Sequence, residues 1–382
     1  MPADVKAYLS ARTGTHANAA IYQEFENLYE RKLWHQLTVL LLDVTTSEDI
    51  KSDLIPTYND FINAFELDMN PLSLVVILQR VAAHKGSDKE AAEFLVSKKE
   101  TVKTHKDASL SLSLAIGQYH LKQSDLTAVK AILEGARPEV ENNDMVPLDI
   151  RGEFYALSSG YEKQRGNFTN YYRDALRQLG CVSDTAAPTT LSPTEQQKEA
   201  TDLAVAALLS DDIYNFGELL AHPILTRLEG TNDEWVLQLI RAFNAGDVDA
   251  YEKLQPQWMT HSDLVANLIT VRGKMSLTAL VNLIFKRPVD GRVIAFKDIA
   301  AAAKISDNEV ELLIMAAISR KLIEATIDGV AETTSVFWVH PRVLDRVQIG
   351  TMATKLEQWA KSVEGTIATT SALDADAVFR EE

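Results

Sequence analysis

The chain has 382 residues, of which 46% are hydrophobic and 24% charged, so it contains enough apolar side chains for the cores of two or three folded domains. Its formal net charge of −16 at pH 7 argues against nucleic acid or an anionic membrane surface as the main partner, because both would repel it. The single cysteine, Cys181, excludes an intramolecular disulfide framework and is typical of a reducing compartment.

The N-terminus shows no targeting pattern. Met1-Pro2-Ala3-Asp4 lacks the charged and apolar regions of a secretory signal, and the longest apolar runs, such as Val39–Leu42, are too short to span a bilayer. The sequon at Asn167-Phe168-Thr169 is interpreted as a helix N-cap. These features predict a soluble, intracellular protein without a membrane partner.

Residues 21–179 have helical periodicity almost throughout. We expect one long helix at Ile21–Val44, a second at Asp53–Leu67, and a third that Asn70 caps and Pro71 begins, since proline is well tolerated at the first helical position. Further helices are expected at Lys89–Thr104, Ala108–Lys122 and Leu126–Gly135, with connections marked by Gly86, Ser124 and Pro138.

Two stretches of this helical region, Gly117–Gly135 and Gly160–Leu179, resemble each other. Each has a glycine in a first helix, then a polar capping residue (Ser124 or Asn167) and a second helix. The two glycines are 43 residues apart, which is longer than a regular tetratricopeptide unit. We therefore expect irregular helical hairpins stacked as a solenoid whose concave face binds proteins. An ordinary helical bundle has the same periodicity and remains an alternative.

Val182–Pro193 has no periodicity and two prolines, which predicts a linker. Helices are expected again at Thr194–Leu209 and Asp211–Ala221. The adjacent acids Asp211 and Asp212 are interpreted as favourable charges at the N-terminus of the second helix rather than as an acid–base pair. The chain then continues with a break at His222-Pro223, a hairpin turning at Ala245-Gly246 between Asn232–Asn244 and Asp247–Leu254, and a helix at Leu264–Phe285.

Residues 293–339 follow the element order of a winged helix. A β-prone run at 293–296 precedes a short helix at Lys297–Ala303. Ser306-Asp307-Asn308-Glu309 has the form of a capping box that opens a helix at Glu309–Ser319, with Val310, Leu313, Ile314, Ala317 and Ile318 inward. Two β-rich runs, Leu322–Asp328 and Ser335–Val339, flank an Asp328-Gly329 turn and predict a hairpin.

The second helix of this winged helix does not suit nucleic acid. Residues 307–319 include Asp307, Glu309 and Glu311 but neither lysine nor arginine, so this face would repel phosphates. Lys286, Arg287 and Arg292 precede the unit, and we interpret them as solvated surface charges. The unit is therefore interpreted as a protein-interaction module, with a winged-helix nucleic-acid binder as the less favoured alternative.

After Pro341 the periodicity is helical again. Five apolar residues have the 3-4-3-4 spacing of a heptad seam, and their full burial would contribute roughly 8–15 kcal/mol before entropic costs: Ile349, Met352, Leu356, Trp359 and Val363. Such a helix either folds back on its own domain or enters a bundle with other chains. Beyond Gly365 the small, acidic tail is expected to be mobile.

The sequence predicts no catalytic residue, no metal site and no cofactor. The eight histidines fall in no H-E-x-x-H pattern, and there is neither a C-x-x-C pair nor a glycine-rich phosphate loop. Cys181 is interpreted as a small, partly buried hydrophobic residue. A Cys–His pair formed in space, and with it a hydrolase, is the alternative.

Several blocks of sequence carry a closer resemblance: Tyr29–Thr38, Asn70–Val75, Phe216–Leu220 with His222-Pro223, Ala242–Val248, Asn308–Leu313 and Trp338–Asp345. In the same order, from about Ile21 to Val363, they resemble the family of 26S proteasome non-ATPase regulatory subunit 13, the PCI-domain subunit of the regulatory-particle lid. The resemblance implies a mostly α fold with N-terminal helical-hairpin repeats at 1–170. A PCI domain follows at 171–341, with its helical part to about 285 and its winged helix from about 286. A C-terminal bundle helix and acidic tail occupy 342–382.

The resemblance also implies a function and partners. The chain is expected to be a non-catalytic scaffold of the lid, needed for lid assembly and ubiquitin-dependent degradation, in the cytoplasm and nucleus. Its expected partners are other lid subunits, above all a neighbouring PCI subunit, near the deubiquitinase and ubiquitin-receptor subunits. The expected interface residues are the five heptad residues together with Phe337 and Trp338 of the wing. A PCI subunit of the COP9 signalosome or of a translation-initiation scaffold is the nearest alternative.

Overall fold

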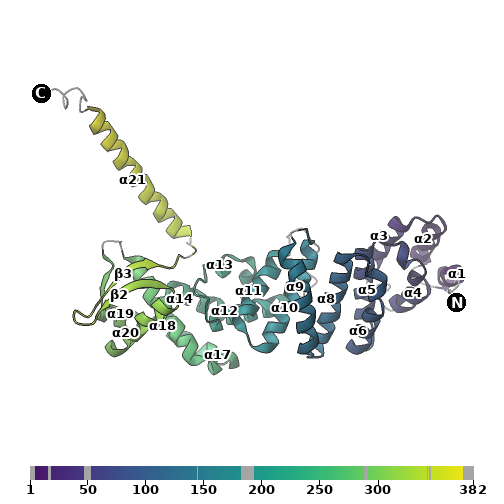
Figure 1. Cartoon of the computed structure of the whole chain (residues 1–382), viewed down its shortest axis with the longest axis horizontal. Coiled ribbons are helices and arrows are strands. Elements are labelled where there is room, and N and C mark those ends of the chain that lie inside the picture. Colours follow the sequence, from purple (N-terminus) through teal and green to yellow (C-terminus); the bar gives the residue numbers. More distant parts are fainter. Residues whose placement is uncertain are drawn as a thin grey trace. The chain divides into compact units, whose positions relative to one another are not determined.

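The computed structural model describes residues 5–15, 19–46, 53–143, 145–181, 193–287, 291–341, 343 and 346–372. These residues are mostly helical, with one three-stranded sheet (Figure 1). The chain divides by its packing into two compact units, residues 1–188 and 189–382. This division lies later in the chain than the boundary predicted after residue 170. Residues 182–192 of the predicted linker lie outside the described residues.

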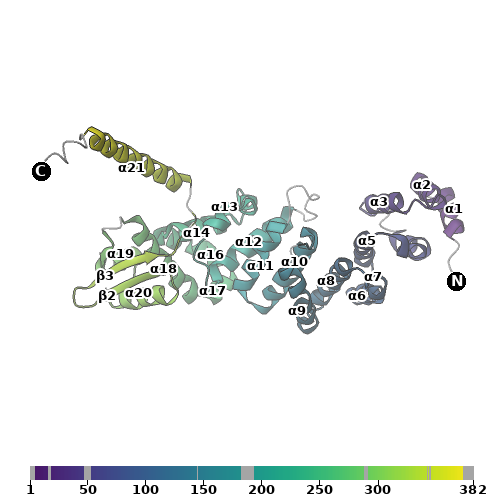
Figure 2. The same cartoon turned by 45° about the horizontal axis from the view of Figure 1, so that its top comes forward.

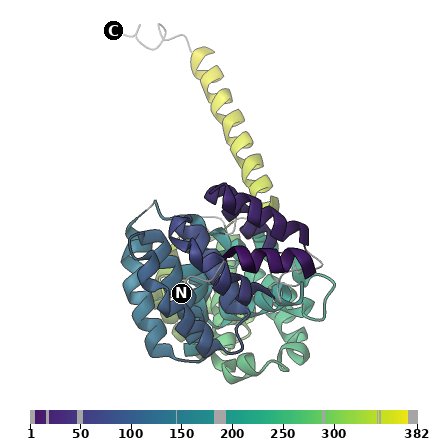
Figure 3. The same ribbon diagram turned by 90° about the vertical axis from the view of Figure 1, so that its right-hand side faces the viewer.

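The first unit consists of helices (Figure 2). They are α1 (Val5–Thr15), α2 (Ala19–Glu30), α3 (Trp34–Val44), α4 (Leu54–Asp60), the 3-10 turns η2 (Ile62–Ala64) and η3 (Glu66–Asp68), α5 (Pro71–Ala83), α6 (Asp88–Ser97), α7 (Lys99–Val102), α8 (Lys106–Lys122), α9 (Leu126–Asn142), α10 (Leu148–Arg165) and α11 (Phe168–Cys181). Figure 3 shows α1 and α2, in purple, side by side.

The prediction of one helix at Ile21–Val44 was wrong, because the chain turns between α2 and α3. Lys32 adopts a left-handed conformation (φ 53°), and the N–H of Leu33 donates to the carbonyl of Leu28 at 3.0 Å. Helices often end in a turn of this kind, and its left-handed position is usually a glycine. Here that position is a lysine, so the sequence did not indicate the turn.

The lengths of three other helices were also predicted incorrectly. The expected helix at Asp53–Leu67 is α4 followed by two 3-10 turns, and the one at Lys89–Thr104 is divided into α6 and α7 at Lys98. Helix α9 continues past Gly135 to Asn142 with Pro138 inside it. Its buried stripe of Val129, Leu133, Ala136 and Val140 continues beyond the proline, so packing maintains the helix there.

An aromatic cluster fills the core where α2, α3, α4 and the 3-10 turns meet. The Phe61 and Phe65 rings lie 5.1 Å apart between centroids, and Phe25 lies 5.5 Å from Phe61. Trp34 stacks on Phe65 at 5.5 Å, and the Tyr29 ring meets Trp34 edge-on at 5.6 Å. Phe25, Phe61 and Phe65 are almost entirely buried. Ring pairs in such arrangements stabilise a core beyond the area they bury.

The two glycines of the repeated pattern lie where α8 and α10 pack against each other. A Cβ atom on Gly117 of α8 would lie 2.6 Å from Cδ2 of Leu157 on α10. A Cβ atom on Gly160 of α10 would lie 2.6 Å from Cδ2 of Leu121 on α8. A leucine of each helix thus packs directly against the glycine of the other helix. This close packing explains why each repeat has a small residue at that position.

The predicted caps of these hairpins were partly right. Asn167 caps α11, since its side-chain oxygen accepts from the N–H of Asn170 at 3.3 Å. Ser124 is not the cap of α9. Instead it turns the chain with φ 59°, and Asp125 accepts from the N–H of Ala128 at 3.2 Å. Asn70 caps α5 as predicted, accepting from the N–H of Leu72 at 3.0 Å with Pro71 at the first position.

The second unit contains both helices and strands. They are α12 (Pro193–Leu209), α13 (Gly217–Ala221), the 3-10 turn η4 (Pro223–Leu228), α14 (Glu234–Ala245), α15 (Val248–Lys253), α16 (Gln255–Trp258), α17 (Ser262–Ala266), α18 (Leu268–Lys286), β1 (Val293–Ala295), α19 (Phe296–Ala303), the turn η6 (Asp307–Glu309), α20 (Val310–Ser319), β2 (Ile323–Asp328), β3 (Thr333–Val339) and α21 (Arg346–Ala372).

Asp211 and Asp212 do not begin a helix, so that prediction was wrong. Residues 211–216 form a loop. At the end of α12 a buried lysine side chain donates to backbone carbonyls that would accept from backbone N–H groups if the helix continued. The Nζ of Lys274, which is 2% exposed, donates to the carbonyls of Ala207 and Ser210 at 2.7 Å each. Burial lowers the pKa of Lys274 to about 7, against the opposing influence of the two aspartates.

The winged helix predicted from the sequence is confirmed. The three strands form an antiparallel sheet in the order β1-β3-β2, and α18, α19 and α20 pack on it (Figures 1 and 2). Its core contains buried residues from all of these elements, among them Leu280, Ile299, Ile314, Ile323 and Val336. The Glu309 carboxylate accepts from the backbone N–H of Ser306 at 3.1 Å, as a capping box requires. Leu313 and Ile318, predicted inward, are half-buried.

Helix α18 is long and apolar enough to cross a membrane by length and composition alone. Half of that apolar stretch is buried within the second unit, where Leu277, Leu280 and Ile284 pack against the winged helix. A buried core helix meets the same criterion, so its composition is explained by this packing.

Helix α21 extends past Gly365 to Ala372, where a mobile tail was expected from Thr366 onward. The threonine hydroxyls of this stretch donate to carbonyls four residues earlier: Thr366 to Ser362 at 2.9 Å and Thr370 to Thr366 at 2.8 Å. These hydroxyls are thus bonded within the helix itself, as threonine hydroxyls inside helices often are. Residues from Leu373 onward lie outside the described part of the chain.

Candidate protein-interaction surfaces

Within the described residues, no group of three or more histidine, cysteine, aspartate or glutamate side chains could hold a metal ion. Cys181 is half-buried at the end of α11, and this burial raises the pKa of its thiol. A catalytic cysteine needs the opposite shift, toward the thiolate. The second unit exposes several large apolar side chains, which are candidates for contact with other proteins.

The wing exposes two consecutive aromatic residues because β3 contains a bulge. Trp338 pairs with Glu324 and Val336 with Ala325, so Phe337 is an extra residue without a partner in β2. A bulge interrupts the alternation of side chains and redirects them. As a result Phe337 is 67% exposed and Trp338 40% exposed, next to the buried Val336. Among the residues that the structure describes, β2 pairs with β3 alone, so its other edge is available for strand pairing.

The outward face of α20 is also apolar. Leu312 is 65% exposed and Met315 57% exposed, and the acidic Glu311 lies beside them. These two side chains were not predicted from the sequence as a surface feature, although both fall between the buried positions Val310, Ile314 and Ala317. A winged helix that reads nucleic acid presents cations and amides here, whereas an apolar and acidic face suits a protein partner.

The predicted heptad seam on α21 is fully on the surface. Every α21 side chain that the structure describes (349–350 and 352–370) is exposed. The seam residues range from 39% exposed at Val363 to 67% at Trp359, with Ile349, Met352 and Leu356 between them. The 3-4 spacing places the next seam position at Thr366, and the adjacent Ile367 is 59% exposed; neither was included because the helix was expected to end earlier. Their role as an interface is a prediction that exposure alone does not test.

The comparisons with known proteins cover both units. A family model for PSD13 N-terminal repeats matches residues 21–240, and one for the PCI domain matches residues 251–338. A Schizosaccharomyces pombe protein, "Probable 26S proteasome regulatory subunit rpn9", is 34% identical over 92% of each chain. A Dictyostelium discoideum protein, "26S proteasome non-ATPase regulatory subunit 13", is 33% identical over 90% of each chain. The chain belongs to the family of 26S proteasome non-ATPase regulatory subunit 13.

Membership in the subunit 13 family assigns names to the parts already described. The N-terminal repeats of the family extend across α2 to α11 and into the second unit, and the PCI match ends within β3. A Schizosaccharomyces pombe "Eukaryotic translation initiation factor 3 subunit M" is 25% identical over 42% of this chain. That match is weaker and partial, so it does not show membership of the translation-factor family.

Proposed function

We propose that this chain is a non-catalytic structural subunit of the 26S proteasome regulatory-particle lid, required for lid assembly and thereby for ubiquitin-dependent degradation. The observation that supports this most strongly is a sequence identity of about one third to relatives that are named as proteasome regulatory subunits. The match covers 90% or more of the length of each chain, and the PCI family model extends through most of the winged helix.

The interface residues follow from the exposed apolar surface. The seam on α21 enters a helical bundle with other lid subunits, and Phe337 and Trp338 of the wing contact a neighbouring PCI subunit. Because the seam side chains are about half exposed, burying the remainder would contribute on the order of 5 kcal/mol before the cost of association. The deubiquitinase and ubiquitin-receptor subunits lie nearby, and the complex works in the cytoplasm and nucleus.

The test changes two seam residues. Leu356→Asp with Trp359→Asp places two charges in the middle of the proposed bundle contact, where they would be desolvated. Both side chains are exposed in the free chain, so its own fold is expected to persist, as circular dichroism and gel filtration of the purified chain would show. In cell extract we expect the variant to elute near 42.4 kDa instead of with a large complex that carries lid subunits and peptidase activity.

Thr354→Asp with Gln358→Asp is the matched control. It adds the same two charges to α21 on the side away from the seam, and both positions are exposed. This control is expected to assemble normally. Wild-type chain that elutes only as a monomer or small dimer would refute the lid function. A large complex whose subunits, identified by mass spectrometry, belong to the COP9 signalosome or a translation-initiation scaffold would replace it with that assembly.

A further inference from the structure

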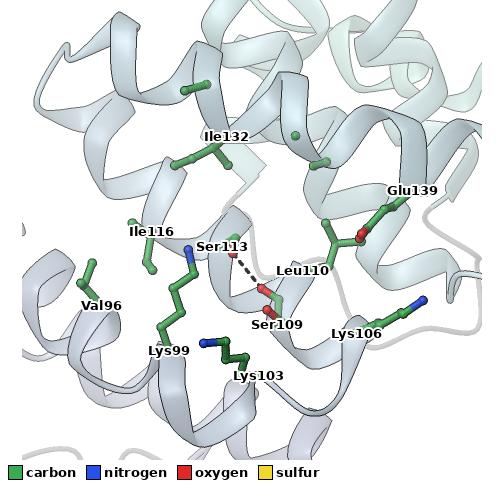
Figure 4. Close-up of a pocket in the computed structure, with 13 residues that line it drawn as sticks. Val96, Lys99, Lys103, Lys106, Ser109, Leu110, Ser113, Ile116, Ile132 and Glu139 are labelled. Carbon is green, nitrogen blue, oxygen red and sulfur yellow. Dashed lines mark hydrogen bonds between the residues drawn. The ribbon is translucent and has the colours of Figure 1, made fainter.

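The first unit contains a groove of about 530 Å³ between α7, α8 and α9 (Figure 4). Its volume falls in the range of sites that bind ligands, about 300–1,000 Å³. The floor is a stripe of α8 in which Leu110 and Ile116 alternate with the hydroxyls of Ser109 and Ser113. The Ser113 hydroxyl donates to the carbonyl of Ser109 at 2.8 Å, so this hydroxyl is already satisfied within its own helix.

The groove is basic in a chain that is strongly acidic. Three lysines line it against one glutamate, Glu139, while the whole chain has a net charge of −16. In Figure 4, Lys99 and Lys103 extend into the hollow from one side and Lys106 lies at its end. Lys103 forms a 3.2 Å ion pair with Glu100, but both side chains are more than two-thirds exposed. An exposed pair of this kind contributes little, so an incoming carboxylate can replace it.

The α9 wall of the groove is built from small residues. Ala131, Gly135 and Ala136 lie there, and a Cβ atom on Gly135 would meet nothing within 4 Å. A glycine inside a helix costs stability relative to alanine, and no neighbour within the fold requires one at this position. The backbone of α9 is therefore open to close approach by another chain.

We propose that this groove binds an acidic peptide segment of a protein partner, with apolar side chains on the α8 floor and carboxylates on the three lysines. We infer an acidic peptide because its carboxylates would complement the positive charge of the lysines. We infer apolar residues in it because the exposed Val96 and the Ile132 side chain offer apolar surface beside the floor. Nucleic acid fits less well. The lining contains no arginine for paired phosphate contacts and no aromatic ring for base stacking, and Glu139 faces the same space.

The experiment selects peptides from a random dodecapeptide library displayed on phage, using the full-length chain as bait. We expect enrichment of sequences that combine aspartate or glutamate with leucine, isoleucine or phenylalanine. The affinity of an enriched peptide is then measured by fluorescence anisotropy. Replacing Lys99, Lys103 and Lys106 together by glutamate should weaken it about tenfold or more. Gly135→Leu, which retains every charge but fills the groove, should weaken it similarly.

Two comparisons separate this site from general attraction between charges. Lys32, Lys89 and Lys130 are exposed and lie outside the groove lining. Replacing these three by glutamate changes the net charge by the same amount as the groove variant and should leave the peptide affinity within about twofold. Circular dichroism checks that each variant is folded. The proposal is overturned if no acidic and apolar motif is enriched, or if both lysine sets weaken the peptide equally. Tighter binding of a fluorescent oligothymidylate than of the peptide, lost on reversal of the groove lysines, would assign the groove to nucleic acid instead.

Discussion

Gly117 and Gly135 occupy neighbouring helices of the first unit, yet replacing each by alanine should shift stability in opposite directions. A Cβ atom on Gly117 would lie 2.6 Å from Cδ2 of Leu157, closer than real Cβ contacts allow. A Cβ atom on Gly135 would lie in open space. Both residues are inside helices, so both substitutions remove the same conformational freedom from the unfolded chain.

The magnitudes follow from these distances. Leu157 is fully buried, and Cδ1 of Ile132 would lie 3.6 Å from the same added Cβ atom, so overpacking at Gly117 should cost about 1–3 kcal/mol. The helical gain of alanine over glycine, about 0.5–1 kcal/mol, offsets part of this cost. Gly117→Ala should therefore destabilise α8 and α10 by about 0.5–2 kcal/mol. Gly135→Ala should stabilise α9 by about 0.5–1 kcal/mol.

Hydrogen exchange of the full-length chain, followed by mass spectrometry of peptides from each helix, measures these local effects. A chain with two compact units need not unfold in one step, so a single melting temperature would mix them. Amides of α8 and α10 should exchange about 2–30 times faster in Gly117→Ala. Amides of α9 should exchange about 2–5 times slower in Gly135→Ala.

The contact between position 117 and Leu157 is tested by shortening the leucine side chain. Leu157→Ala removes the atom that an alanine at 117 would meet, although it also leaves a cavity. In that background Gly117→Ala should become neutral or stabilising, because only the helical gain remains. If Gly117→Ala destabilised the chain equally with and without Leu157, the close approach of α8 and α10 would not be the reason for the glycine.

Three further outcomes are expected. Folding lowers the pKa of Lys274 from 10.5 to about 7 through burial, so wild type should gain stability over Lys274→Met as pH rises from 7 to 10, which exchange of α18 amides in the two chains, compared at each pH, would show. Gly246→Ala should destabilise α14 by about 1–3 kcal/mol, since its φ is 65° and the new Cβ would lie 2.5 Å from Nδ2 of Asn282, and exchange of α14 amides measures this. Asn70→Ala removes the cap of α5 and should cost about 0.5–2 kcal/mol, seen as faster exchange at its first turn.

The winged helix could be predicted from sequence because its local signals and its tertiary packing agree. The capping box at Ser306 and Glu309, the spacing of Val310 and Ile314, and the turn at Asp328 each indicated the element that the structure contains. At Asp328 the carboxylate accepts from the N–H groups of the two residues after Gly329, a pattern that local chemistry alone encodes. Agreement between levels of this kind makes a segment predictable.

Two helix ends were predicted incorrectly, one because an unusual residue type forms the turn and the other because the contact at the helix end comes from a distant part of the sequence. Lys32 adopts a left-handed conformation that favours glycine, so its residue type gave no sign of a turn. The loop at Asp211 lies beside Lys274, which is 63 residues away in the sequence and donates to the carbonyls of Ala207, in the last turn of α12, and Ser210, just after it. Periodicity within a short window contains no information about a contact of that length. The lysine groove was missed for the same reason, because α7, α8 and α9 each contribute only part of it.

The surfaces proposed for binding differ in the kind of contact they can make, and this difference follows from their side chains. The α21 seam and the wing present large apolar residues, including Trp359 and Phe337, whose burial provides affinity. The groove on the first unit presents flexible lysines around a narrower apolar floor, which favours rapid, salt-sensitive and reversible binding. A subunit that is held in a complex by the first kind of surface can still exchange partners at the second. The lysine groove is therefore suited to a partner that joins and leaves the assembled complex.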